Sequence, residues 1–227
     1  TAFNQNISSW VTSSVLDMSA MFQGAAVFNA AIPKSGSQWD TSAVKDMSNM
    51  FNGATVFNQN IGSWGTGSVI DMSNMFNGAD AFNQDISLWH TSSVTDMSAM
   101  FQGAILFNAA IPKSGSQWDT TAVTDMSNMF NGAAAFNQDL STWVTSSVTD
   151  MNSMFQGAIL FNYAMVTSGA VWDTSKVTDM SNMFNSAGSF NQDISSWVVS
   201  AVANFNSMFN GAIAFNKGFT MTTSWTG

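Results

Sequence analysis

Tryptophan recurs at nearly regular intervals and divides the whole chain into units of similar length. The nine tryptophans stand 25 to 29 residues apart, a period typical of stacked repeat proteins. They are Trp10, Trp39, Trp64, Trp89, Trp118, Trp143, Trp172, Trp197 and Trp225. A unit of this length is too short to bury a core alone, so neighbouring units must stack. The sequence therefore predicts a single solenoid of about nine stacked rungs over residues 1–227.

Each unit repeats the series Val-x-Asp-Met-Ser-x-Met-Phe-x-Gly-Ala-x-x-Phe-Asn-x-x-Ile, followed by Trp-x-Thr-Ser. In the unit from Val69 to Trp89, apolar steps of three, three and one predict a short helical or 3₁₀ turn at residues 69–76. The four-residue step from Phe82 to Ile86 predicts a short strand near residues 84–88. We therefore expect an α/β repeat with short strands on one face and helical turns on the other.

The rungs have two main lengths, 25 and 29 residues, because some carry four extra residues before tryptophan. In two long rungs these residues lie in Pro-Lys-Ser-Gly-Ser segments at 33–37 and 112–116, and a weaker version lies between Phe161 and Trp172. Such residues favour turns. An insertion on one face leaves the stacked core intact, so we expect the loops to project from one side.

Composition limits the classes of partner. Hydrophobic residues make up 45 % of the chain, charged residues 8 %, and the formal net charge is −9 with no arginine. Phosphate binding needs a cationic patch, so nucleic acid is not an expected partner. No apolar run approaches the roughly 18 residues of a membrane span. The absence of cysteine excludes disulfides and suits a cytosol or a bacterial exterior. Because residue 1 falls in mid-rung, we expect a mature product or a piece of a longer array.

Two motifs resemble those of a known family. Val-Thr-Asp-Met-Ser-Ala-Met-Phe stands at residues 94–101, and Phe-Asn-Gln-Asp-Ile-Ser-Ser-Trp stands at residues 190–197. They resemble the repeats of BspA-like leucine-rich-repeat surface proteins, in particular the mycoplasma-type branch. The resemblance covers residues 1–225. It implies a leucine-rich-repeat-like solenoid, an extracellular or cell-surface location, and adhesion to host or matrix molecules, and it supplies no catalytic residue.

Several columns of the repeat allow both a structural and a functional interpretation. The methionine columns suit core packing better than Cu(I) binding, and the aromatic columns suit inward stacking better than sugar binding. The aspartate column from Asp17 to Asp179 suits hydrogen-bonded caps, with calcium binding between rungs as the alternative. The threonine column that follows tryptophan suits backbone hydrogen bonds. Its alternative is a hydroxyl ladder that matches ice or a crystalline polysaccharide.

The polar residues beside the inward isoleucine are the preferred binding candidates, because the open face of a solenoid is an extended binding surface. With the lysines of the two loops, the candidate residues are Gln59, Asn60, Gln84, Asp85, Gln138, Asp139, Gln192, Asp193, Lys34 and Lys113. Plain solvation is the alternative role for each of them.

No unique constellation of catalytic residues occurs, and the lone His90 stands in a variable column. We expect no enzyme, no cofactor and no dedicated metal site. The predicted function is an extracellular adhesion or ligand-binding surface whose partner is a host or matrix protein or a glycan. The first alternative is a filament subunit that stacks head to tail through uncapped rungs. The second is binding to ice or another crystalline surface through the Thr/Ser ladder.

Overall fold

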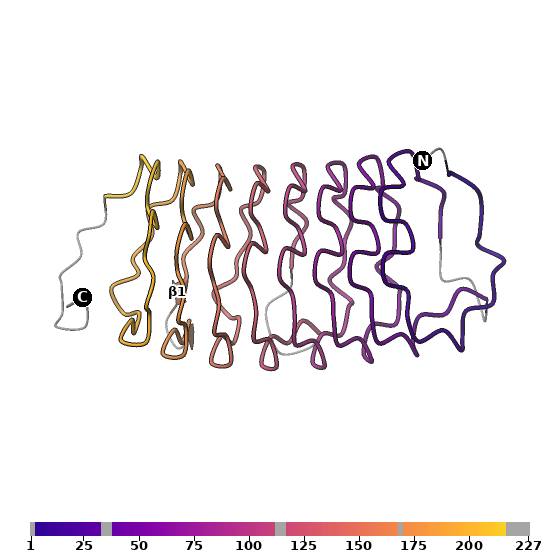
Figure 1. The fold of residues 1–227 in the computed structure, drawn as a ribbon, viewed down its shortest axis with the longest axis horizontal. Helices are drawn as coiled ribbons and strands as arrows, with labels where there is room; N and C mark the ends of the chain where they lie inside the picture. The colour runs from indigo at the N-terminus through magenta and orange to yellow at the C-terminus, as the bar shows by residue number, and fades with distance from the viewer. Residues whose placement is uncertain (1–2, 33–37, 112–116, 168–169, 217–227) are drawn as a thin grey trace.

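The chain winds into a coil whose turns lie side by side along the longest axis, from the indigo end to the yellow end in Figure 1. A computed structural model describes residues 3–32, 38–111, 117–167 and 170–216. Within them we number eight rungs, each from the first valine of the repeat. These valines are Val15, Val44, Val69, Val94, Val123, Val148, Val177 and Val202. A partial turn, residues 3–14, precedes the first rung.

Backbone hydrogen bonds of one polarity join the rungs from the fourth to the tenth residue of each rung. Parallel bridges link the aspartate of each rung to its equivalent in the next, from Asp17 with Asp46 to Asp179 with Asn204. From Met18 to Gly24, the amide of every second residue donates to a carbonyl of the following rung at 2.7–2.9 Å. The same four donations recur as far as the seventh rung, from Met180 to Ser186. Each rung thus donates forward and accepts from behind at these columns.

The segment predicted to be helical forms consecutive turns instead. In the third rung, the amides of Met75 and Asn77 donate three residues back along the chain, to Met72 and Asn74 at 3.3 and 3.0 Å. Asn74 has φ 57° and Gly78 has φ 65°, which is the left-handed region that Asn and Gly enter most easily. The positive φ of Asn74 interrupts any helix over residues 69–76, and no helix occurs in the described ranges. The prediction for residues 69–76 located the turn but gave the wrong element.

The strand predicted near residues 84–88 is also not formed. The strands of the described residues are β1 (Val166–Thr167) and β2 (Ala170–Val171), an antiparallel pair in the long segment before Trp172. Near residue 84 the rungs are joined through side chains, because the amide of Asn83 donates to Oδ1 of Asn58 at 3.0 Å. A side-chain acceptor replaces the backbone carbonyl that a β-ladder would use.

The core consists of stacked columns of aromatic and methionine side chains, as the sequence predicts. Phe76 and Phe82 stack within one rung with ring centroids 3.9 Å apart, and Phe76 stacks on Phe101 of the next rung at 5.6 Å. Met75 and Trp89 are fully buried in the same rung. Methionine fills the space between the aromatic columns, because its flexible side chain adapts to irregular gaps.

The threonine column after tryptophan is buried, and its hydroxyl groups bond to the backbone as the structural interpretation predicts. Thr66 has no exposed surface. Its Oγ1 donates to the carbonyl of His90 at 2.9 Å and accepts the amide of His90 at 2.8 Å. These threonines therefore cannot form the exposed ladder on which ice or crystal binding was based. Only the adjoining positions, such as Ser92, face solvent there.

Candidate interaction surface

The glutamines of the predicted binding stripe form hydrogen bonds between rungs. The side-chain amide of Gln84 donates to Oδ1 of Asn58 at 2.8 Å, and Gln59 donates to Oδ1 of Asn29 at 3.0 Å. Gln138 and Gln192 make the equivalent bonds to Asn108 and Asn162 of the preceding rungs. The side-chain amide of each glutamine thus donates a hydrogen bond that joins two rungs. The sequence pattern did not indicate this role.

The aspartate or asparagine that follows each of these glutamines in the sequence closes a local turn. Asp85 Oδ1 accepts the amide of Ser87 at 2.8 Å, and hydrogen bonds from the Ser87 hydroxyl and amide lower the pKa of Asp85. Asn60, Asp139 and Asp193 accept the amide two residues later in the same way, at 2.9–3.0 Å. The loop residues Lys34 and Lys113 lie outside the described residues.

An asparagine column, which the sequence analysis did not single out, joins the rungs along this face. The side chain of Asn58 accepts both the amide of Asn83 at 3.0 Å and the side chain of Gln84 at 2.8 Å. The recurring Phe-Asn pair was the available signal. An asparagine that follows an inward phenylalanine in every rung is placed to meet its equivalents along the stack.

The aspartate column forms turns of the same kind. Asp96 Oδ1 accepts the amide of Ser98 at 2.8 Å, and the equivalent bond recurs in the other rungs. The hydroxyl and amide of Ser19 lower the pKa of Asp17 in this way. Within the described ranges, no three acidic, histidine or cysteine side chains gather to hold a metal ion. The hydrogen-bonded role of this column is confirmed, although the turn it closes is not helical.

Exposed threonines form a different row from the one predicted. Thr95, Thr124, Thr149 and Thr178 follow the first valine of their rungs and are exposed. The hydroxyls of the last three donate at 3.1–3.2 Å to the carbonyl of the preceding threonine in the row. The hydroxyl groups therefore reinforce the stack while their methyl groups remain on the surface.

Exposed aliphatic side chains occur in adjacent pairs at the corner between the Gly-Ala pair and the following phenylalanine. Ile105, Leu106, Ile159 and Leu160 are 47–56 % exposed. Between these two pairs lies the Ala134–Ala135 pair of the fifth rung. We call these six residues the apolar corner.

Backbone hydrogen bonds make the apolar corner continuous across three rungs. The amide of Ala135 donates to the carbonyl of Ile105 at 3.1 Å, and the amide of Leu160 donates to the carbonyl of Ala134 at 3.3 Å. Asp80 and Ser189 of the flanking rungs give the corner polar borders. In the sequence, these apolar pairs occupy the two variable positions that follow Gly-Ala in the repeat. Only the stacking of rungs brings the pairs together.

No helix in the described part of the chain is long and apolar enough to cross a membrane. Comparison with curated proteins and with solved structures gave no match. The model of the family described as Mycoplasma protein of unknown function, DUF285, matches residues 32–114, 87–168 and 110–225 in overlapping segments. These segments span the stacked rungs and most of the chain, so the protein belongs to the DUF285 repeat family.

Proposed function

We propose that this protein is a non-enzymatic, extracellular solenoid of the leucine-rich-repeat type that serves as an adhesion or ligand-binding surface. We further propose that the apolar corner is its main contact with a host or matrix protein. The BspA-like resemblance of the repeat motifs supports the adhesive role and the extracellular location. A binding role also suits a coil in whose described residues no single rung stands out as a unique chemical site.

The contrast between buried and exposed columns supports binding by the lateral surface. The inward columns repeat the same residue types from rung to rung, because each must fit its neighbours in the stack. The corner columns change from Ala-Val and Thr-Val in the first two rungs to Asp-Ala, Ile-Leu and Ala-Ala in the next three. Because these exposed positions do not repeat, one part of the coil has a surface composition that differs from the rest.

The apolar corner is the observation that carries the proposal. Exposed apolar patches with polar borders are typical of protein–protein contacts, and aliphatic side chains held on a rigid backbone lose little freedom on binding. The predicted Gln and Asp stripe is a weaker candidate, because its side chains already bond within the coil. A glycan partner would rely on polar groups, whereas this corner offers leucine and isoleucine.

Binding of the chain to a panel of purified extracellular-matrix proteins and to a glycan array tests the proposal. In the Leu106→Ser, Leu160→Ser double variant, we expect affinity for at least one matrix protein to fall about tenfold or more. Leu88→Ser is the matched control, because Leu88 is 58 % exposed, close to the 56 % and 53 % of the two corner leucines, and lies in a different turn.

Three outcomes would count against the proposal. If the chain bound no protein in the panel, adhesion to matrix proteins would be contradicted. Equal binding by the double variant and the control would show that the contact lies elsewhere on the coil. Binding to glycans alone would replace the protein partner with a carbohydrate.

A further inference from the structure

The three residue pairs of the apolar corner differ in side-chain size. Leu106 of the fourth rung and Leu160 of the sixth are 56 % and 53 % exposed. The Ala134–Ala135 pair between them is half-buried, and each of its side chains ends at one methyl group. Because the three pairs stand at equivalent positions of the repeat, the alanines leave room between the two leucines for a side chain of a partner.

The rungs of the apolar corner are spaced like strands of a parallel sheet. Parallel bridges join Asp96 to Asp125 and Asp125 to Asp150, which belong to the same three rungs. Neighbouring strands lie about 4.8 Å apart, so the fourth and sixth rungs are roughly 10 Å apart along the stacking axis.

This spacing suits an α-helix laid along the stack. A helix advances about 5.4 Å per turn, so one turn follows one rung closely and residues i and i+7 lie roughly 10 Å apart. An extended strand repeats its facing side chains every roughly 6.6 Å, which falls out of step with the rungs. The spacing therefore favours a helical partner.

The two ends of the apolar corner differ in charge. Asp80 of the third rung adjoins Leu106, whose amide donates to the carbonyl of Asp80 at 3.2 Å. The carboxylate of Asp80 is partly exposed and has no hydrogen-bond or ion-pair partner among the described residues. At the other end, the amide of Ser189 donates to the carbonyl of Ile159 at 3.1 Å, and this border is uncharged. One end of the corner is therefore negative, and the net charge of −9 also favours a cationic partner.

We propose that the apolar corner binds a cationic amphipathic helix of the partner protein, which lies along the stacking axis. This inference rests on the proposed function, because it names what the partner presents at the same surface. Apolar side chains at i and i+7 would contact Leu106 and Leu160, and one at i+3 or i+4 would lie over the alanines. A lysine or arginine one turn before i would face Asp80. Apolar residues at such intervals are a recurring means by which a helix binds a protein surface.

Fluorescence anisotropy with three synthetic peptides tests the inference on the 227-residue chain. The first peptide has leucine at i, i+4 and i+7 and lysine one turn before i. The second replaces that lysine with glutamate, and the third carries a central proline that breaks the helix. We expect the first peptide to bind about tenfold or more tightly than either of the others.

Two charge variants test the position of the cation. Asp80→Asn should weaken binding of the lysine peptide about threefold at low ionic strength, and the difference should vanish in 1 M NaCl. Asp119→Asn is the matched control. It removes the same charge from the turn after Trp118 and keeps an acceptor for that turn, so it should leave binding unchanged.

Ala135→Leu separates helix recognition from general hydrophobic attraction. The larger side chain fills the space that the partner would occupy, so binding should weaken about tenfold. Non-specific attraction would instead strengthen, because the substitution adds exposed apolar area.

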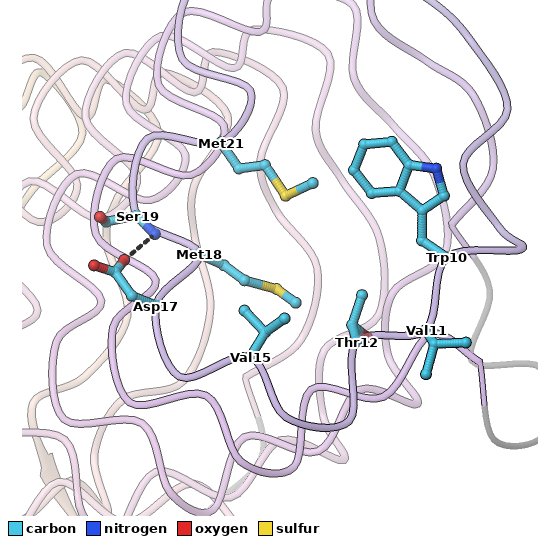
Figure 2. A pocket seen from close by; sticks show the side chains of 8 residues that line it. All are labelled: Trp10, Val11, Thr12, Val15, Asp17, Met18, Ser19 and Met21. Carbon is cyan, nitrogen blue, oxygen red and sulfur yellow. Dashed lines mark hydrogen bonds between the residues drawn. The ribbon is translucent and has the colours of Figure 1, made fainter.

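An apolar cavity elsewhere in the chain supplies a second control. Trp10, Met18 and Met21 help to line a cavity of about 570 Å³ near the start of the coil. Figure 2 shows Trp10 on one side of this space and the two methionines on the other. Met21→Gln places a polar group there and should leave peptide binding unchanged.

Loss of peptide binding in both the Leu106→Ser, Leu160→Ser variant and Asp80→Asn would support the inference. Equal binding of the three peptides, tighter binding by Ala135→Leu, or loss of binding only in Met21→Gln would overturn it. If the chain bound a matrix protein through the same leucines but none of the peptides, the helix would be wrong and the adhesive role would stand. Peptide binding without binding to any matrix protein would support the helix and contradict that role.

Discussion

The side-chain amide of Asn204 donates to Oδ2 of Asp179 at 3.0 Å, and it does so across a rung boundary. At the other described boundaries of this column, an aspartate faces an aspartate. Asn204 still accepts the amide of Asn206 at 3.0 Å, as an aspartate would. Position 204 therefore isolates the effect of charge in this column, because the local turn is the same with either residue.

Asn204→Asp should destabilise the fold by about 0.5–1 kcal/mol at low ionic strength, because it replaces a hydrogen bond with a like-charge contact near the surface. Salt screens exposed charges, so the difference from the parent should shrink in 1 M NaCl. Urea unfolding at two salt concentrations measures both effects. A salt-independent loss would indicate that geometry, not charge, distinguishes the two residues.

Replacement of Asp96 separates the hydrogen bond of the turn from the charge of the carboxylate. Asp96→Ala removes the acceptor for the amide of Ser98 and should lower the free energy of unfolding by about 1 kcal/mol. Asp96→Asn keeps an acceptor and removes the charge, so it should be close to neutral in chemical denaturation. Equal losses in both variants would show that the charge itself is needed.

Acid should destabilise the coil. Hydrogen bonds lower the pKa of Asp17, Asp85 and Asp173 below its usual value. Burial raises the pKa of Asp179, but the hydrogen bonds from Ser181 and Asn204 together outweigh it, so that pKa is also lowered. A carboxyl whose folded pKa lies below its unfolded value stabilises the fold above the unfolded pKa. The free energy of unfolding should therefore stay level from about pH 7 to 5 and fall below about pH 4.

Urea unfolding at a series of pH values measures this profile. Asp85→Asn should fall less steeply in acid than the parent, because the amide keeps the turn without titrating. Stability that rises as the pH approaches 4 would mean that repulsion within the aspartate column outweighs these hydrogen bonds.

Ser186 has φ 61° in a column where the other described rungs carry glycine with φ of 65–75°. A side chain in this region costs free energy that glycine avoids, so Ser186→Gly should stabilise the protein by about 0.5–1 kcal/mol. Gly157→Ala is the reciprocal change and should destabilise it by about the same amount. Thermal unfolding of both variants measures the effect, and a loss of stability in Ser186→Gly would contradict it.

Two buried tryptophans differ in one hydrogen bond. The indole of Trp118 donates to the carbonyl of Ile86 at 2.9 Å, whereas the buried indole nitrogen of Trp143 has no partner among the described residues. Trp118→Phe should cost about 1 kcal/mol more than Trp143→Phe, because it removes a satisfied buried hydrogen bond. The Ile86 carbonyl keeps the amide of Trp89 as a donor at 3.1 Å. Urea unfolding of the pair measures the difference. Equal losses would show that packing alone decides the cost.

Residue chemistry was sufficient to predict the inward columns and several polar roles. Phe76, Met75 and Trp89 recur at the positions that fill a stacked core, and all three are buried. The Asp96 turn and the Thr66 backbone bonds were also predictable, because short polar side chains reach neighbouring backbone groups. The spacing of apolar residues was misleading at residues 69–76, where a helix-like pattern belongs to a series of turns.

The sequence by itself determined the period of the rungs, the stacked core and the residues that fill it, because these follow from a pattern repeated within one chain. Only the tertiary structure decided what the asparagine and glutamine columns do and which exposed residues lie together. Gln84 bonds to Asn58, 26 residues away, and the carbonyl of Ile105 accepts the amide of Ala135 in the next rung. Such contacts depend on the register between rungs and on the direction of their hydrogen bonds. Stacking therefore joins the glutamines of the predicted binding stripe to asparagines of the preceding rungs and brings the residues of the apolar corner together.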